Sequence, residues 1–272
     1  MLKVLELFGG IGACSKALER LGVDFEIADY VEIDKYAVAS FNAMHGTNFE
    51  PQDICEWNKD IEVDLIMHGS PCQDFSLAGS QAGGNEGSGT RSSLMYETIR
   101  IVEKLKPKYV IWENVRNILA KRHKHNFDNY INRLEELGYK SYYQVLNAKD
   151  YGVPQHRERV FTISIKNDIN KQFEFPLKQK LNLGLKDVLE SEVDEKYYFS
   201  EKIIKYIGAA ETGEYIPVKN ATKKGYQEAY EGDSVNLAYP DSKTRRGRVG
   251  KQVAQTLQCN DFMGVVCKKC NT

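Results

Sequence analysis

The sequence has no strong excess of either charge, because 37 Lys and Arg residues are matched by 38 Asp and Glu among its 272 residues. Bulk electrostatic attraction to nucleic acid is therefore excluded, and any such contact must come from local basic clusters. No apolar run approaches the roughly 18 residues that a membrane-spanning helix needs. The first six residues, MLKVLE, are too few and too acidic to form a signal peptide.

Cysteine is sparse and shows no spacing typical of a disulfide framework, which favours a reduced, cytosolic chain. The six cysteines are Cys14, Cys55, Cys72, Cys259, Cys267 and Cys270. The last two form a CxxC pair like half of a zinc knuckle. No second CxxC pair or paired histidine follows them in the sequence, so we predict no metal site.

Residues 3–165 alternate between short apolar runs and helical patterns. Strands are expected at 4–8, 25–32, 63–68, 109–112, 141–147 and 160–165, and helices at 13–21, 35–45, 92–105 and 125–137. This alternation is typical of an α/β fold in which helices flank a mostly parallel sheet. Ligands of such sheets bind at the carboxyl ends of the strands, so the residues that follow the strands are the candidates for a site.

The alternation weakens after about residue 168. Residues 169–244 are rich in Lys, Glu, Tyr and Asn without a regular period, which predicts a small irregular domain. Residues 73–91 are rich in Gly, Ser, Ala and Gln. Long loops in compact domains are often functional, so we expect this segment to act as a lid.

The run FGGIG at 8–12 follows the first expected strand. Its glycines allow a ligand to approach the backbone closely, or they simply form a tight turn. Glu32 ends the second strand, where a carboxylate can bind ribose hydroxyls or remain a solvated charge. Asp53 either accepts from an adenine amino group or caps a turn.

The run GSPCQ at 69–73 places Cys72 directly after a strand and behind Pro71, which restricts the backbone. A cysteine held there with a loop after it suits a reactive thiolate. The alternative is a buried cysteine that acts as a small apolar residue.

Charged residues end two further strands. Glu113 follows an apolar strand, so we expect a partly desolvated carboxyl group with a raised pKa that can act as an acid, or else a helix cap. In QHRER at 155–159, Arg157 and Arg159 alternate at strand spacing. They suit carbonyl oxygens or phosphates, or they form an ion-pair ladder with Glu158.

Basic residues cluster at 244–251, where Arg245, Arg246 and Arg248 could grip a phosphate backbone or remain solvated. The run KRHKH at 121–125 is a weaker candidate of the same kind.

Together, FGGIG, the strand-end glutamate, GSPCQ, ENV at 113–115 and QHRER resemble the cytosine-C5 DNA methyltransferases over residues 3–165. The resemblance implies a Rossmann-like, seven-stranded sheet that uses S-adenosylmethionine, with a small irregular target-recognition region. It further implies an enzyme of DNA methylation, of restriction–modification or phage type, in the cytoplasm of a bacterial or phage-infected cell. The expected divisions are a catalytic domain at 1–168, a target-recognition region at 169–244 and a partial return segment at 245–272.

The resemblance also implies a role for each matched residue. Cys72 is the expected nucleophile, with Glu113, Arg157 and Arg159 holding the flipped target cytosine of duplex DNA. The expected cofactor residues are Phe8, Gly10, Gly12, Glu32, Ile33, Asp53, Ile54 and Pro71. The expected DNA contacts are Gln81 and Arg91 on the loop, and Arg245, Arg246 and Arg248.

The sequence departs from the family's pattern at its end, where the last family motif, an Asn-Ser pair before an apolar helix, is not found. We therefore expect either a second polypeptide that supplies this motif, a truncated gene, or weak cofactor binding. Two other functions stay open. One is the tRNA-directed branch of the family, although its Cys-Phe-Thr element is absent, and the other is a non-catalytic DNA-binding remnant or half of a split enzyme.

Overall fold

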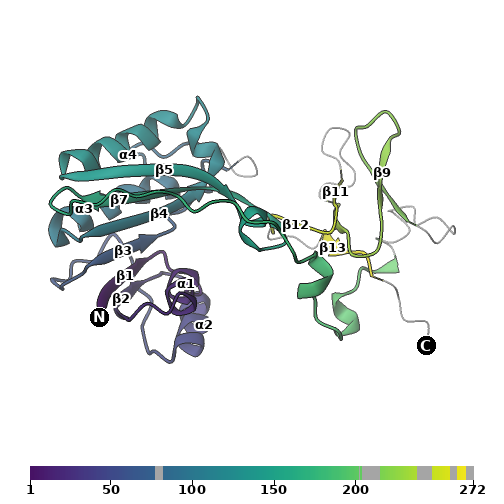
Figure 1. Cartoon of the computed structure of the whole chain (residues 1–272), viewed down its shortest axis with the longest axis horizontal. Helices are drawn as coiled ribbons and strands as arrows, with labels where there is room; N and C mark the ends of the chain where they lie inside the picture. Colours follow the sequence, from purple (N-terminus) through teal and green to yellow (C-terminus); the bar gives the residue numbers. More distant parts are fainter. Residues whose placement is uncertain (77–81, 202, 204–214, 238–246, 258–261, 268–272) are drawn as a thin grey trace. The chain divides into compact units, whose positions relative to one another are not determined.

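The computed structural model describes residues 1–76, 82–201, 203, 215–237, 247–257 and 262–267. The chain forms two compact units (Figure 1). The first comprises Met1–Leu146 and Arg159–Phe175, and the second comprises Asn147–Glu158 and Pro176–Thr272. Each unit is described by itself below.

A six-stranded sheet forms the centre of the first unit, with the order β2-β1-β3-β4-β7-β5. β1 pairs with β2 and β3, and β3 with β4, all in parallel, whereas β7 runs antiparallel to β4. The α/β fold predicted from the sequence is therefore confirmed. The strands are β1 (Leu2–Leu7), β2 (Phe25–Val31), β3 (Leu65–His68), β4 (Tyr109–Val115), β5 (Tyr139–Asn147) and β7 (Glu158–Lys166).

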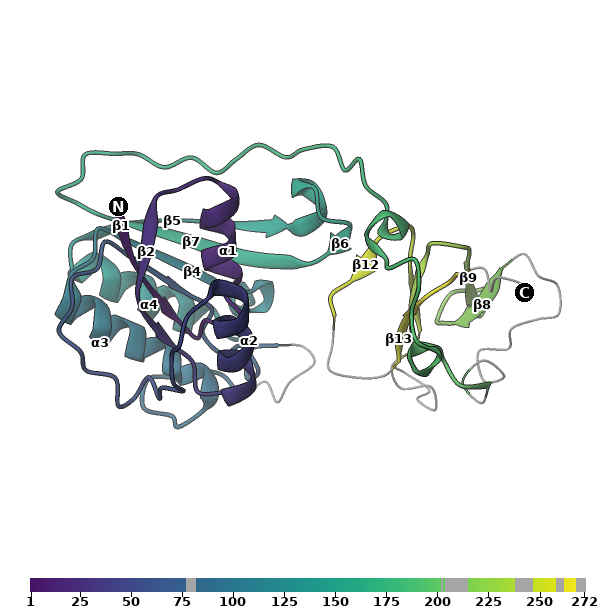
Figure 2. The ribbon, with the colours of Figure 1, turned by 90° about the horizontal axis from the view of Figure 1, so that it is seen from below.

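Four helices cover the sheet: α1 (Ala13–Arg20), α2 (Lys35–His45), α3 (Met95–Leu105) and α4 (Lys124–Glu136). Successive strand residues point to opposite faces, so Val4 and Met67 pack with α1 while Leu5 and Trp112 join the core under α3 and α4. Figure 2 shows α1 and α2 on one side of the sheet and α3 and α4 on the other. Among the described residues, no helix has the length and apolarity that a membrane crossing requires.

The sheet of the described residues has one strand fewer than the resemblance implies. Next to the end of β2, the Gln52 N–H donates to the Glu32 carbonyl at 2.8 Å. Pro51 has no N–H to donate, and the chain then turns, with the Glu56 and Trp57 N–H groups bonded to the Asp53 carbonyl. The segment therefore runs beside β2 without building a ladder.

The described residues of the second unit form three small sheets. β10 (Ser234–Asn236) lies between β11 (Arg248–Gly250) and β13 (Met263–Val265), and β8 (Ile216–Lys219) forms a hairpin with β9 (Tyr226–Ala229). β6 (Gln155–His156) pairs in parallel with β12 (Ala254–Gln255). This pairing draws residues 147–158 into the second unit, so the compact units do not follow the expected divisions by residue number. The functional roles assigned to those divisions stay predictions.

Asp233, at the turn before β10, joins this turn to the segment at 251–252. Its buried carboxylate accepts from the Tyr230 N–H at 2.9 Å, the Gln252 N–H at 3.0 Å and the Lys251 Nζ at 2.8 Å. Burial raises the pKa of this carboxyl, but Lys251 and the backbone donors outweigh burial and hold the pKa below its usual range. The ionised form therefore stabilises the fold.

We predict that Asp233→Asn lowers the free energy of unfolding by about 2 to 4 kcal/mol at pH 7, because charged hydrogen bonds are lost and Lys251 loses its partner. Since the pKa is lowered in the folded state, this contribution is present above the carboxyl's ordinary pKa of 3.8 and is lost as the pH falls through the folded value. The difference between the two proteins should shrink on acidification.

Hydrogen exchange at the Tyr230 and Gln252 amides measures this effect locally. The control is Asp194→Asn, which alters an exposed pair with Lys196 and should leave protection unchanged. Equal protection in wild type and Asp233→Asn would show that the carboxylate does not hold the unit together.

Candidate active site

The loop after β3 lies against the end of β4. His68 pairs with Trp112 in the parallel register, so Gly69 leaves the sheet next to Glu113. A Cβ added at Gly69 would lie 3.8 Å from the Glu113 Oε2. The loop therefore passes within van der Waals reach of this carboxylate.

Hydrogen bonds between Ser70 and β4 hold the loop in place. The buried Ser70 hydroxyl accepts from the Trp112 Nε1 at 3.0 Å and from the Asn114 Nδ2 at 3.4 Å. The same Asn114 amide donates to the Ser70 carbonyl at 3.4 Å. Both partners belong to β4, so this strand positions the backbone two residues before Cys72. The sequence interpretation missed Ser70 and Asn114, although both lie inside the motifs that it used.

Cys72 is half-buried and packs against the main core. Its carbonyl accepts from the Phe75 N–H at 3.0 Å and the Ser76 N–H at 2.8 Å, which closes a turn directly after it. Phe75 is fully buried, and its carbonyl accepts from the Asn117 Nδ2 at 2.6 Å. The backbone at Cys72 is thus fixed on both sides. The half-buried Pro71 and the bonded Ser70 precede it, and the hydrogen-bonded turn follows it.

The other thiols of the first unit are poor nucleophiles. Burial, together with the Glu6 and Glu113 carboxylates, raises the pKa of Cys14 to about 12. Burial and the Asp53 carboxylate raise the pKa of Cys55 as well. Because the thiolate is the reactive form, both remain protonated at neutral pH.

Glu113 and Arg159 form an ion pair, with 3.0 Å between the Arg159 Nε and the Glu113 Oε1. In the antiparallel ladder Arg159 lies opposite Val115, two residues from Glu113, so both side chains project from the same face. β4 runs on to Val115, so Glu113 lies within the strand and does not end it, contrary to the prediction. Both side chains are mostly buried, with Glu113 30% and Arg159 15% exposed. The ion pair fixes the orientation of the carboxyl group relative to the guanidinium.

Arg157 lies between β6 and β7, so Arg157 and Arg159 alternate in sequence but do not lie on one continuous strand. Its N–H donates to the Asn147 Oδ1 at 3.1 Å, and its carbonyl accepts from the Ala148 N–H at 3.0 Å. These bonds hold Arg157 in the second unit, whereas Arg159 belongs to the first.

The glycine turn after β1 meets the end of β2. The Gly10 N–H donates to the Glu32 Oε2 at 3.1 Å, and the Tyr30 hydroxyl donates to the Gly10 carbonyl. A Cβ added at Gly10 meets nothing within 4 Å, so the turn faces open space. At Gly12, with φ of +86°, an added Cβ would lie 2.8 Å from the Phe41 ring. Only glycine fits there.

The remaining expected cofactor residues differ in accessibility. Ile33 is 67% exposed next to Glu32, and Phe8 is half-buried with φ of 52°. The Asp53 Oδ1 accepts from the Cys55 N–H at 2.9 Å, so Asp53 caps a turn, the alternative left open by the sequence. The Ile54 side chain is buried in the core. An apolar surface beside a carboxylate and an open glycine turn fits a nucleoside, which is the chemistry expected of the cofactor.

The expected DNA contacts are described only in part. Arg91 is exposed at the start of the 3₁₀ helix η1 (Arg91–Leu94), and Arg248 is exposed at the start of β11. The stem of the 73–91 loop is closed by reciprocal bonds of 3.1 Å between Asp74 and Ser92. Gln81, Arg245, Arg246 and Cys270 lie outside the described residues.

The chain is similar to known DNA methyltransferases. The family model described as C-5 cytosine-specific DNA methylase matches residues 2–264. The chain is 35% identical over 253 residues to type II methyltransferase M2.ScrFI of Lactococcus lactis subsp. cremoris, a match that covers 73% of this chain and 70% of that protein. It is 30% identical to orphan methyltransferase M.SPRI of Bacillus phage SPR, a match that covers 97% of this chain and 72% of that protein.

Among solved structures, a DNA modification methyltransferase encoded within an E. coli prophage is similar, with a TM-score of 0.59 and 26% identity. That match covers 71% of this chain and 57% of the prophage protein. The family match and the sheet agree: this chain belongs to the C-5 cytosine-specific DNA methylases and is a methyltransferase enzyme.

Proposed function

We propose that the chain transfers a methyl group from S-adenosylmethionine to carbon 5 of a cytosine in duplex DNA, with Cys72 as the covalent nucleophile. The observation that carries the proposal is the juxtaposition of the Cys72 loop, held by Ser70, with the Glu113–Arg159 pair. The target base must leave the stack to reach such a site, because the ring is inaccessible within a duplex.

Cys72 makes carbon 5 reactive. Its thiolate adds to carbon 6 of the cytosine, and the electron pair of the 5,6 double bond becomes available at carbon 5. Carbon 5 then takes up the methyl group and subsequently loses its proton. The carbon–sulfur bond to Cys72 breaks, the thiolate leaves and the double bond is restored.

Glu113 and Arg159 stabilise the ring during addition. Glu113 delivers a proton to ring nitrogen 3 and accepts from the exocyclic amine, while Arg159 donates to the carbonyl oxygen at carbon 2. The pairing between the Arg159 Nε and Glu113 uses one of the five N–H donors of a guanidinium, and it keeps the Glu113 carboxylate oriented. Arg157 is proposed as a second contact to the same nucleotide.

The cofactor, when bound, supplies the methyl group as an electrophile on a sulfonium. Glu32 would accept from the ribose hydroxyls, since a carboxylate offers about four acceptor positions and two are occupied, by the Gly10 and Asp34 N–H groups. Ile33 and Phe8 would contact the adenine, with Asp53 and the Ile54 backbone at its edge. Gly10, Gly12 and Pro71 would leave room for the rest of the molecule.

The proposed partner is duplex DNA, contacted by Arg91 and Arg248 through its phosphates, and the proposed location is the cytoplasm, where that DNA is accessible. The second polypeptide expected from the sequence stays a prediction.

We predict that a duplex with 5-fluorocytosine at the target position traps a denaturation-resistant adduct in the presence of S-adenosylmethionine, because fluorine cannot leave carbon 5 as a proton does. Gel electrophoresis in denaturant measures the adduct. Cys72→Ala should abolish it, whereas Cys55→Ala, at an exposed thiol of the same unit, should retain it. An adduct that persists in Cys72→Ala would exclude the proposed nucleophile.

We predict that Glu113→Gln lowers kcat for methyl transfer about 100-fold or more, because the amide can bond to Arg159 but cannot give or take the proton. Tritiated methyl transfer to duplex DNA measures this, with Glu136→Gln on the exposed end of α4 as the control. Equal rates in the two variants would remove Glu113 from the reaction. The same assay on tRNA distinguishes the RNA-directed alternative, and DNA binding without transfer distinguishes the non-catalytic one.

A further inference from the structure

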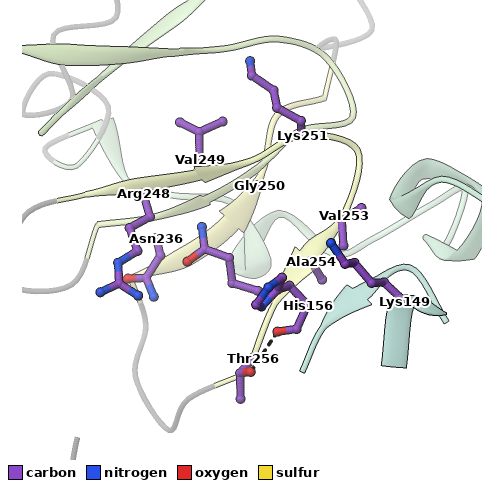
Figure 3. Close-up of a pocket in the computed structure, with 11 residues that line it drawn as sticks. Lys149, His156, Asn236, Arg248, Val249, Gly250, Lys251, Val253, Ala254 and Thr256 are labelled. Atoms are coloured by element: carbon purple, nitrogen blue, oxygen red, sulfur yellow. Dashed lines mark hydrogen bonds between the residues drawn. The ribbon is translucent and has the colours of Figure 1, made fainter. Parts of the chain in front are cut away.

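A cavity of about 400 Å³ lies within the second unit (Figure 3). His156, Arg248 and Thr256 are among the residues that line it, and the Thr256 hydroxyl donates to the His156 carbonyl at 2.9 Å. Arg248 already belongs to the proposed contact with DNA, so the cavity adds no separate function. The first unit holds a different feature, a buried carboxylate that the proposed reaction does not use.

Asp29 carries that carboxylate, and a shift in strand register places it. Val4 of β1 pairs with Ile27 of β2, but the next residue, Leu5, pairs with Asp29, so β2 contains one extra residue, Ala28. The shift brings Asp29 beside Leu5, which belongs to the core under α3 and α4. Asp29 is only 3% exposed there. A charge so deeply buried is stable only when donors compensate it.

Three side chains of the segment at 52–59 compensate Asp29. The Gln52 Nε2 lies 3.1 Å from its Oδ1, the Trp57 Nε1 lies 2.7 Å from its Oδ2, and the Lys59 Nζ lies 2.8 Å from the same Oδ2. Two of the three donors are themselves mostly shielded from water, with Trp57 buried and Gln52 half-buried. The carboxylate therefore holds the segment to β2 near both of its ends.

Arg100 holds the same segment to α3. Its Nη2 donates to the Ile54 carbonyl at 2.8 Å, and its Nη1 donates to the Trp57 carbonyl at 2.9 Å. Its Nε donates to Glu97 at 2.7 Å, which fixes the plane of the guanidinium. A planar guanidinium can bond to two carbonyls at once, whereas an ammonium group is a single point charge. The segment thus has a second anchor, opposite in charge to Asp29.

We propose that Asp29 is a positioning residue that, together with Arg100, determines which nucleobase the cofactor site accepts. The inference rests on the proposed function, in which Asp53 and the Ile54 backbone lie at the edge of the adenine. Both residues lie inside the doubly anchored segment.

The two bases differ at that edge. A carboxylate beside a backbone N–H matches the amino group and ring nitrogen 1 of adenine, and it opposes the carbonyl oxygen and ring N–H of hypoxanthine. Polar groups discriminate in this way only while they keep their places, because a segment that moves can adapt to either base. The anchors at Asp29 and Arg100 keep those groups in place.

Selectivity between adenine and hypoxanthine tests the assignment. Isothermal titration calorimetry compares S-adenosylhomocysteine, in which a thioether replaces the sulfonium, with S-inosylhomocysteine, which carries hypoxanthine. We predict that wild type prefers the adenosyl compound and that Asp29→Asn lowers the ratio of the two affinities about tenfold. The uncharged amide is a weaker acceptor for Trp57 and Lys59, so the segment loosens.

Two milder variants test the same point if Asp29→Asn does not fold. Trp57→Phe retains an aromatic ring in the core but removes one donor to Asp29, and Arg100→Lys retains the charge but not the paired bonds. Each should lower the ratio of affinities about three- to fivefold. Hydrogen exchange at the amide of residue 57, which bonds to the Asp53 carbonyl at 3.0 Å, should accelerate in all three variants.

Asp64→Asn is the matched control. The Asp64 carboxylate also accepts from a lysine, the Lys108 Nζ at 2.7 Å, and from a backbone donor, the Lys3 N–H at 3.0 Å. It directly precedes β3, at the opposite end of the parallel strands from the expected cofactor residues. Asp64→Asn should lower the thermal stability but leave the ratio of affinities unchanged, which separates positioning from general stability.

An unchanged ratio in the folded variants, with wild type selective, would overturn the inference, and so would a wild type that binds both compounds equally. Methyl transfer to duplex DNA is measured separately. Transfer with an unchanged ratio defeats the positioning role alone. A ratio that falls as predicted, in a chain that transfers no methyl group, defeats the proposed function alone.

Discussion

The antiparallel register between β4 and β7 is the constraint on which the site depends. It sets Arg159 opposite Val115 and therefore diagonal to Glu113, on the same face of the sheet. A shift of one residue would turn one of the two side chains to the other face. The buried apolar residues of both strands prevent such a shift, since it would expose Val110, Trp112 and Val160. Packing of the core thus determines the electrostatics of the site.

β4 serves the site in two ways at once. Glu113 offers its carboxylate on one face, while Trp112 and Asn114, on the other, hold Ser70 and so the backbone that leads to Cys72. Cys72 and Glu113, the proposed nucleophile and acid, are consequently placed by neighbouring residues of one strand. Their relative position does not depend on the long loop at 73–91, whose stem is closed separately by Asp74 and Ser92.

The sequence predicted the parts that local patterns encode. Alternating apolar runs located the strands of the first unit within a few residues, and the residues next to their ends pointed to Cys72, Glu113 and Arg159 as candidates. The parts that depend on pairing between distant segments could not be read in this way. β6 and β12 are about 100 residues apart and both are only two residues long, so neither has a periodicity of its own. For the same reason the sequence did not predict the role of Asp233, the break at Arg157 or the cavity next to His156.

The division into units has a consequence for how the second unit can be exchanged between relatives. The second unit is not one insertion with a single entrance and exit, since residues 147–158 belong to it and return the chain to β7. A graft that moved only residues 176–272 from a relative would bring β12 without the β6 with which it pairs. Exchange between relatives therefore favours segments that carry β6 and β12 together. The sequences of these two strands should change in concert over evolution.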